Sequence, residues 1–209
     1  TSGLRIALNL VNEVKKQDPT RPVTEAHVDL GGLTGHGSTW EQRAPHLALL
    51  DLIGYNYAFQ TYQTDHRKHP ERIMYASEFM PPLSLQNWQT VEQLPYVIGN
   101  FSWTAMDYLG EAGVGVPRLV DDQPGEFYNP MAEIGQFFNI DSWPMVINYQ
   151  GDLDLTGNPK APYYYQHVVW REMPLAILVH TPVPDGKREI TSPWGFPDEL
   201  RSWNWAGHE

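Results

Sequence analysis

The chain has 209 residues, of which 41% are hydrophobic and 19% charged, and its 14 basic and 25 acidic side chains give a formal net charge of −11. This composition predicts a folded globular protein, and the acidic balance disfavours nucleic acid as a partner because phosphate backbones bind basic surfaces. Cysteine is absent, which excludes disulfides and a cysteine nucleophile, and no run approaches the roughly 18 to 20 apolar residues of a membrane helix, so no membrane partner is expected.

The first predicted element is an amphipathic helix over Ser2–Gln17. Apolar residues recur there every three or four positions, as at Leu4 and Ala7. Asp18 and Pro19 end the pattern, because proline cannot continue a helix. The single apolar face predicts a helix at the surface of a folded core.

Strand and helix patterns then alternate about every 20 to 30 residues. The predicted strands, which lie between glycine and proline breakers, are 23–28, 52–57, 72–77 and 100–106. The later predicted helices are 41–50, 59–69 and 84–97, and a glycine-rich loop covers 31–38. This alternation is typical of a parallel sheet whose strands pair in chain order, with helices outside.

Four strand-and-helix units make half of a (β/α)8 barrel, which usually takes about 250 residues. Beyond Glu172 the pattern changes, because 175–180 alternates like a strand and four prolines interrupt the remainder of the chain. We therefore expect residues 1–172 to form half of a barrel, and 173–209 to begin a β-sandwich-like domain or linker. An open half barrel exposes apolar surface and unpaired edges, so either the other half lies on a missing segment or the chain is a fragment.

Four blocks of sequence carry a family resemblance: DPTRPVT at 18–24, LDLIGYNY at 50–57, YASE at 75–78 and GNFSWTAMD at 99–107. In order and spacing they resemble the second half of the catalytic barrel of glycoside hydrolase family 2, which includes β-galactosidases, β-glucuronidases and β-mannosidases. The resemblance covers roughly residues 1–170. It implies an α/β fold, namely a partial (β/α)8 TIM barrel of strands five to eight, followed by the start of a β-rich domain.

Glu78 matches the family's catalytic nucleophile at the end of the seventh strand. The residues alone agree, because a carboxylate that ends an apolar strand lies on the face of a barrel where active sites form. A retaining glycosidase uses such a carboxylate to attack the sugar, with a second carboxyl about 5 to 5.5 Å away as acid and base. The alternative interpretation is a strand-end glutamate that caps the next loop.

The resemblance implies an acid/base glutamate in an Asn-Glu pair before the helix Ser2–Gln17, and this chain has no such pair there. Glu13 is no substitute, because it lies on a helix that packs outside the barrel. We therefore expect the chain to carry the nucleophile without the acid/base residue, and to be inactive alone.

Two aromatic residues match family positions around the nucleophile. Tyr57 matches a tyrosine that hydrogen-bonds and orients the nucleophile, although Tyr55 points to the same side under strict strand alternation. Trp103 matches the tryptophan that forms a wall of the sugar subsite. As core aromatics, both residues would also be ordinary.

Gln150 lies where β-glucuronidases of the family carry a lysine that meets the substrate carboxylate. A neutral amide offers no charge-assisted bond to a uronic acid, so glucuronide specificity is disfavoured. Pro81 stands where the best-known β-galactosidases have a sugar-contacting histidine, a departure that other galactosidases share.

The preferred function is retaining, exo-acting β-glycoside hydrolysis, with β-galactosidase as the favoured specificity and a neutral carbohydrate as the partner. The alternative is a non-catalytic carbohydrate-binding or interaction protein built on a half barrel. The enzyme would need the missing half of the barrel, and an oligomer is compatible with it. Enzymes of this kind are often exported to the periplasm or medium to meet glycans, but the sequence does not determine the compartment.

Two pairs of potential metal ligands occur, Glu25 with His27 and Asp152 with Asp154. Each pair lies on one face of its segment, but the sequence supplies no convincing third ligand for either. We therefore expect solvated or hydrogen-bonded side chains, no metal and no cofactor.

Overall fold

The computed structural model describes residues 2–28, 39–122 and 145–205. The chain forms two compact units. The first unit comprises Thr1–Phe79 and Gln86–Phe101, and the second comprises Met80–Leu85 and Ser102–Glu209. Among the described residues, no helix is long and apolar enough to cross a membrane. The predicted loop at 31–38 lies outside the described residues.

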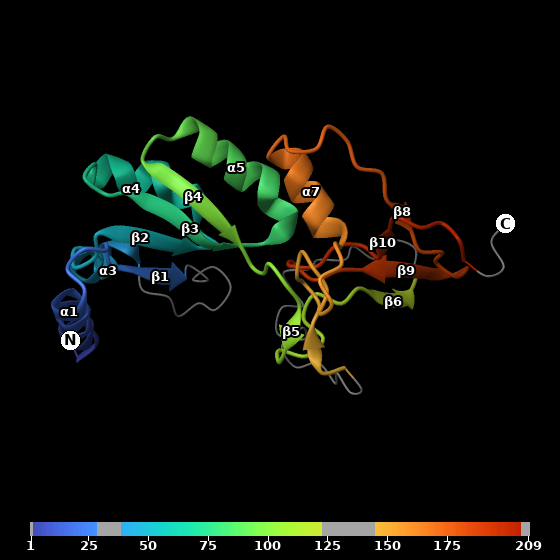
Figure 1. The fold of residues 1–209 in the computed structure, drawn as a ribbon, viewed down its shortest axis with the longest axis horizontal. Helices are drawn as coiled ribbons and strands as arrows, with labels where there is room; N and C mark the ends of the chain where they lie inside the picture. The colour runs from blue at the N-terminus through green and yellow to red at the C-terminus, as the bar shows by residue number, and fades with distance from the viewer. Residues whose placement is uncertain (1, 29–38, 123–144, 206–209) are drawn as a thin grey trace. The chain divides into compact units, whose positions relative to one another are not determined.

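A four-stranded sheet with the order β1-β2-β3-β4 organises the first unit (Figure 1). Its strands are β1 (Thr24–Val28), β2 (Leu52–Asn56), β3 (Met74–Phe79) and β4 (Val97–Ser102). β1 pairs with β2 in parallel, and β2 pairs with β3 in parallel. The strand order is the predicted one, so the parallel α/β architecture inferred from the alternation is confirmed.

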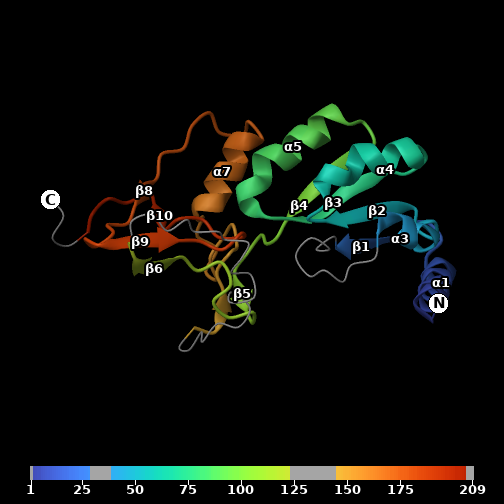
Figure 2. The same ribbon diagram turned by 180° about the vertical axis from the view of Figure 1, so that it is seen from behind.

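The helices of this unit are α1 (Ser2–Gln17), α3 (Trp40–Leu47), α4 (Tyr62–Lys68) and α5 (Ser84–Gln93), with a 3-10 turn η1 (Phe59–Thr61) before α4. Both ribbon views show α4 and α5 on the same face of the sheet (Figures 1 and 2). The hydrophobic core lies on this face, where buried side chains of β2, β3 and β4 pack against the helices. Its buried members are Leu47, Ile53, Tyr55, Ala58, Tyr62, Met74 and Val97.

The predicted boundary between the last helix and the last strand of this unit is wrong. The helix pattern was expected to run to Val97, but α5 ends at Gln93 and β4 already begins at Val97. Pro95 explains the difference, because a proline ring disfavours helical backbone in the residue before it and has no N–H to donate. The apolar spacing that mimicked a helix continues across this break into the strand.

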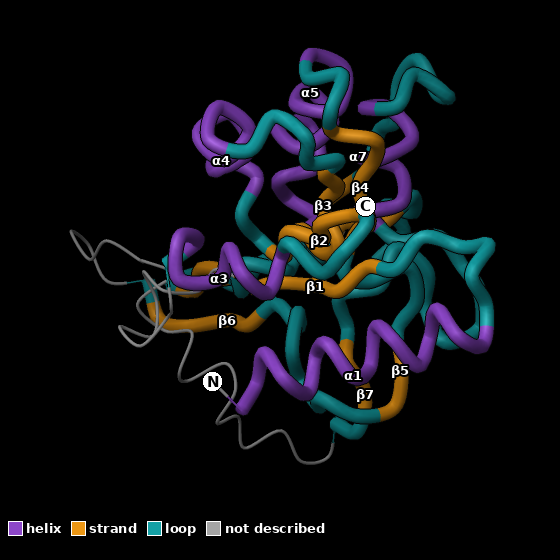
Figure 3. The backbone as a smooth tube through the Cα atoms, turned by 90° about the vertical axis from the view of Figure 1, so that its left-hand side faces the viewer, coloured by secondary structure: helices purple, strands orange, loops and turns teal. Residues whose placement is uncertain are grey.

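The second unit consists of short antiparallel pairs, and Figure 3 shows the strands β5 (Tyr108–Leu109) and β7 (Ile147–Asn148) of one pair side by side. In the other pairs, β6 (Arg118–Asp121) pairs with β9 (Lys187–Ile190), and β8 (Val179–His180) with β10 (Glu199–Leu200). The helix α7 (Ala161–Val169) and the turn η2 (Pro81–Leu83) complete the unit. The expected start of a separate domain at residue 173 stays a prediction.

A buried ion pair anchors α4 to the start of β3. Nη1 of Arg72 donates to both carboxylate oxygens of Asp65 at 2.8 Å, and the hydroxyl of Tyr55 donates to the same carboxylate. Asp65 and Arg72 are 5% and 8% exposed. Burial and the neighbouring carboxylate raise the pKa of Tyr55, which keeps its proton on the donor.

We expect Asp65→Ala to lower the free energy of unfolding by about 3 kcal/mol or more, because it leaves a buried guanidinium without its counter-charge. Urea unfolding followed by circular dichroism measures the change. Glu13→Ala is the control, because the Lys16–Glu13 pair is exposed and its loss should cost less than about 1 kcal/mol. Equal costs for the two variants would contradict the role given to the buried pair.

Candidate active site

The structure brings Tyr57 and Glu78 together at the ends of β2 and β3. The Tyr57 hydroxyl donates to Oε2 of Glu78 at 2.8 Å, and the Tyr57 amide donates to the Glu78 carbonyl oxygen at 2.9 Å. Both side chains are partly buried. The carboxylate therefore has a fixed orientation at the carboxyl edge of a parallel sheet, the edge where ligands bind in α/β folds.

A break in strand alternation separates Tyr57 from Tyr55. Strict alternation puts both rings on one face, yet the Tyr55 hydroxyl bonds Asp65 in the core while the Tyr57 hydroxyl bonds Glu78. Tyr57 has a φ of 57°, in the left-handed region, directly after the end of β2. The register between β2 and β3 also shifts, from Gly54 opposite Tyr75 to Asn56 opposite Glu78.

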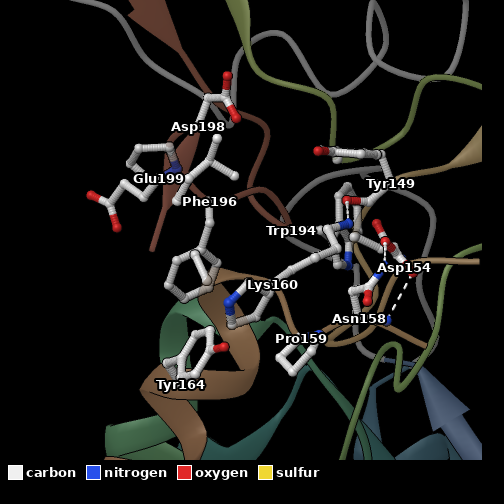
Figure 4. A pocket seen from close by; sticks show the side chains of 16 residues that line it. Tyr149, Asp154, Asn158, Pro159, Lys160, Tyr164, Trp194, Phe196, Asp198 and Glu199 are labelled. Atoms are coloured by element: carbon white, nitrogen blue, oxygen red, sulfur yellow. Dashed lines mark hydrogen bonds between the residues drawn. The ribbon is translucent and has the colours of Figure 1, made fainter. Parts of the chain in front are cut away.

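The second unit contains a pocket of about 280 Å³ (Figure 4). Its lining combines aromatic rings with charged and amide groups. The main side chains are Tyr149, Gln150, Asp154, Asn158, Lys160, Tyr164, Trp194, Phe196, Asp198 and Glu199. Aromatic faces beside hydrogen-bonding groups suit a ligand that is partly apolar and partly hydroxylated.

Gln150 is 1% exposed, and both its amide nitrogen and its amide oxygen lack a hydrogen-bond partner. Buried amides are normally satisfied, so the unpaired amide of this pocket residue departs from the usual pattern. The backbone of Gly115 packs directly on it, since a Cβ at Gly115 would lie 2.7 Å from Cβ of Gln150.

Lys160 supplies a partly buried positive charge on one side of this pocket (Figure 4). Its ammonium donates to both carboxylate oxygens of Asp107, at 2.8 and 2.9 Å, and to the carbonyl oxygen of Tyr149 at 2.7 Å. It also lies 3.6 Å from the centre of the Tyr149 ring. Burial lowers the pKa of Lys160, while Asp107 acts in the opposite direction. The charge is thus compensated within the protein.

Trp103 packs edge-on against Trp194 in the second unit, with ring centroids 5.8 Å apart and an interplanar angle of 83°. The peptide bond between Trp103 and Thr104 is cis. Trp194 lines the pocket, so Trp103 packs against one of the pocket's lining residues. Trp103 and Glu78 belong to different units, so their expected common pocket stays a prediction.

The Asp152 and Asp154 pair divides into two different environments. Asp154 accepts hydrogen bonds from the backbone and side chains of Thr156 and Asn158, which lower the pKa of its carboxyl and hold the loop together. Asp152 accepts a bond of 2.8 Å from the amide of Gln166. Burial raises the pKa of Asp152 to about 7, against the opposing effects of Gln166 and Lys160.

Sequence reasoning missed Lys160, Trp194 and Phe196. An available signal was the segment Ser-Pro-Trp-Gly-Phe-Pro at 192–197, in which two aromatic residues alternate with chain-breaking residues. Such a segment is unsuited to a regular strand, and here it presents its aromatic side chains to the pocket.

The chain is similar to solved structures of glycoside hydrolase family 2 members. No protein-family model and no curated protein matches the chain. Among solved structures, it is similar to two glycoside hydrolase family 2 members from Bacteroides cellulosilyticus. One is 31% identical with a TM-score of 0.71 and 99% of this chain covered. The other, from strain DSM 14838, is 28% identical with a TM-score of 0.63 and the same coverage.

The chain spans about a quarter of the length of these structures, with 24% and 22% of the two proteins covered. An FMN-binding β-glucuronidase from Facaelibacterium prausnitzii L2-6 is 14% identical, with a TM-score of 0.53 over 80% of this chain and 26% of that protein. This third similarity concerns the fold alone.

We expect Asp152→Asn to stabilise the protein more at pH 8 than at pH 5. A carboxyl whose folded pKa is about 7 holds its proton more tightly than the unfolded chain does. The free energy of unfolding therefore falls between the unfolded pKa of about 4 and pH 7, and the neutral amide removes this loss. The difference between variant and parent should grow by on the order of 2 kcal/mol, as measured by urea unfolding at both pH values.

Asp154→Asn is the matched control, because hydrogen bonds lower rather than raise the pKa of Asp154. Its carboxyl is ionised at both pH values in both states, so the effect of this variant should not change between them. A constant stability difference for Asp152→Asn would contradict the raised pKa.

Proposed function

We propose that this chain is part of a retaining, exo-acting β-glycosidase of glycoside hydrolase family 2, with Glu78 as its nucleophile. The observation that carries the proposal is the Tyr57–Glu78 hydrogen bond of 2.8 Å at the carboxyl edge of a parallel sheet. The similarity to two family members, at 31% and 28% identity, supports the assignment of this carboxylate to glycoside chemistry.

In retaining hydrolysis, a carboxylate attacks the anomeric carbon while a second carboxyl protonates the departing oxygen. Glu78 would form the covalent glycosyl intermediate, and Tyr57 would hold Oε2 so that Oε1 faces the sugar. Water, activated by the second carboxyl, then releases the sugar and restores the carboxylate. Orientation of this kind lowers the barrier because the reacting groups are already positioned.

The second carboxyl would come from outside this chain, on the other half of a (β/α)8 barrel in which β1 to β4 are strands five to eight. Among the described strands, β1 and β4 are the ends of the sheet, each with one partner strand. Ile98 and Phe101 of β4 are 59% and 62% exposed. Parallel sheets usually have both faces covered, so these features favour completion by further strands.

The favoured substrate is a neutral β-glycoside, in particular a β-galactoside. Gln150 would bind a hydroxyl group with its unpaired amide, and aromatic side chains such as Trp194 would contact the apolar face of a sugar ring. The charge of Lys160 is already paired with Asp107, so this lysine is not poised to bind a uronic acid carboxylate. We place this pocket among the sugar-binding elements of the whole enzyme.

The second candidate function is carbohydrate binding without catalysis. It is favoured by the pocket of the second unit, in which an unpaired buried amide and aromatic rings are present without Glu78. A binding protein would hold sugar through this pocket and would form no covalent intermediate. Both functions therefore predict that the protein binds sugar, and only the enzyme is expected to hydrolyse it.

We expect Glu78→Gln in the full-length protein to lower kcat on an aryl β-galactoside by about 10³-fold or more, because the amide cannot attack the sugar. Tyr57→Phe should cost less, roughly 10- to 100-fold, because it loosens the orientation without removing the nucleophile. Steady-state kinetics give both values, and circular dichroism checks the fold.

Glu71→Gln is the control variant, because Glu71 is an exposed glutamate shortly before β3 and should leave kcat unchanged. Near-parental rates from Glu78→Gln would contradict the nucleophile. Sugar binding by calorimetry with no hydrolysis even in the parent full-length protein would favour the binding function instead.

We also expect the chain of residues 1–209 to hydrolyse aryl β-galactosides far more slowly than the full-length protein. A positioned general acid is typically worth about 10²- to 10⁴-fold, and the open site admits water. Parallel assays of the two proteins at equal molar concentration measure the ratio. Comparable rates would mean that an acid/base residue lies within this chain.

A further inference from the structure

Three potential metal ligands converge in the first unit, away from the Tyr57–Glu78 pair. Glu25 and His27 lie on β1, two residues apart, so their side chains share one face of the strand. His46 comes from the last turn of α3. One ligand atom from each of the three residues lies within 4.8 Å of the other two. The fold thus supplies the third partner that the sequence alone did not show.

His27 is the buried member of this cluster. It is 9% exposed, and its Nε2 atom is buried without a hydrogen-bond partner. An unsatisfied buried nitrogen is costly in a folded protein, and a bound ion would satisfy it. Burial is also the main cause that lowers the pKa of His27, which favours the neutral imidazole that binds metals.

His46 and Glu25 complete a set of two nitrogen ligands and one oxygen ligand. Nε2 of His46 lies 2.9 Å from Oε2 of Glu25, and the rings of His27 and His46 have centroids 5.0 Å apart at 87°. The Glu25 side chain is 50% exposed and the His46 side chain 28%. An open groove that includes Gly3 and Leu4 of α1 leads to the cluster.

Arg43 is a cation that faces the cluster. Its Nη1 donates to the carbonyl oxygen of Val28 at 2.6 Å, and its guanidinium lies 5.2 Å from the centre of the Trp40 ring. Its charge helps to lower the pKa of His27, while Glu25 acts in the opposite direction. The Glu25 carboxylate is therefore the charge that would offset a bound cation.

We propose that Glu25, His27 and His46 form a divalent transition-metal site, with Zn²⁺ as the ion that fits best. Two imidazoles and one carboxylate are a common zinc ligand set, in which water takes the fourth, open position. Magnesium and calcium prefer sites built only from oxygen. Tetrahedral zinc ligands lie about 3.4 Å apart, so small rotations of the exposed Glu25 and His46 side chains complete the geometry.

The site would act as a cross-link between β1 and α3. It lies on the helix-covered side of the sheet, because His27 is in register with Tyr55, whose ring belongs to the core on that side. Its existence does not depend on the glycosidase proposal, and a bound ion should stabilise the chain whether or not the sugar chemistry is assigned correctly.

The test is zinc binding by the full chain after treatment with EDTA and dialysis. Titration with ZnCl₂ at pH 7.5, in competition with a chromophoric chelator, should give one site with a micromolar or tighter Kd. Saturating zinc should raise Tm, because an ion that binds only the folded state stabilises it. The affinity for zinc should fall as the pH is lowered, because protons compete with the metal ion for its ligands.

Glu25→Gln and His46→Gln are the informative variants, because both side chains are partly exposed and their loss spares the core. Each should weaken zinc binding by about 10-fold or more and remove the rise in Tm. His69→Gln is the matched control, because His69 pairs with Glu71 at 3.5 Å and belongs to no cluster of three ligands among the described residues. It should leave the affinity unchanged.

Substitution with Co²⁺ gives a second readout, because a tetrahedral site with nitrogen and oxygen ligands produces visible absorption bands that Glu25→Gln should weaken. The absence of binding at 100 µM ZnCl₂ would overturn the proposal. A Kd that neither Glu25→Gln nor His46→Gln changes, or tighter binding of Mg²⁺ than of Zn²⁺, would overturn it equally.

Discussion

The pairing of β2 with β3 is the constraint on which both the core and the candidate site of the first unit depend. Gly54 lies between the neighbouring strands at a point of close approach, where a Cβ would come 2.8 Å from the carbonyl oxygen of Glu25 and 2.9 Å from Cβ of Ser77. Three strands can pack at this level only because the side chain is absent. Beyond Gly54 the register shifts and the backbone of Tyr57 is left-handed, and here Tyr55 enters the core while Tyr57 meets Glu78.

Buried charge is handled differently in the two units. Asp65 is neutralised by Arg72 through two hydrogen bonds, so its burial is compensated. Asp152 receives an amide hydrogen from Gln166, and Lys160, the cation that favours its ionised form, is bonded to Asp107 instead. The first unit therefore has a buried, mutually compensated ion pair in its core. The second holds a carboxyl that changes its charge near neutral pH.

The sequence predicted the parallel sheet and its strand order, because the alternation of strands and helices can be read from short stretches of the chain. Apolar periodicity and chain breakers repeat along the chain, and helix α1 was predicted at its observed bounds. The boundary between α5 and β4 was wrong because an apolar spacing continued through Pro95. The candidate nucleophile came from the resemblance of four sequence blocks to a glycoside hydrolase family, and the place of Glu78 at the end of an apolar strand agrees with it. Spacing could not show the register shift at Tyr57 or the approach of His46 to β1, because both depend on tertiary packing.

The left-handed backbone of Tyr57 has a consequence for how this sequence can evolve. A φ of 57° is unfavourable for a bulky side chain and costs on the order of 1 kcal/mol, whereas glycine and asparagine adopt it readily. Random substitution at this position therefore offers an easy gain in stability to any descendant that no longer needs the hydroxyl next to Glu78. If related sequences keep a tyrosine at this unfavourable position, that would be evidence of selection for its hydrogen bond to Glu78, without any assay of activity.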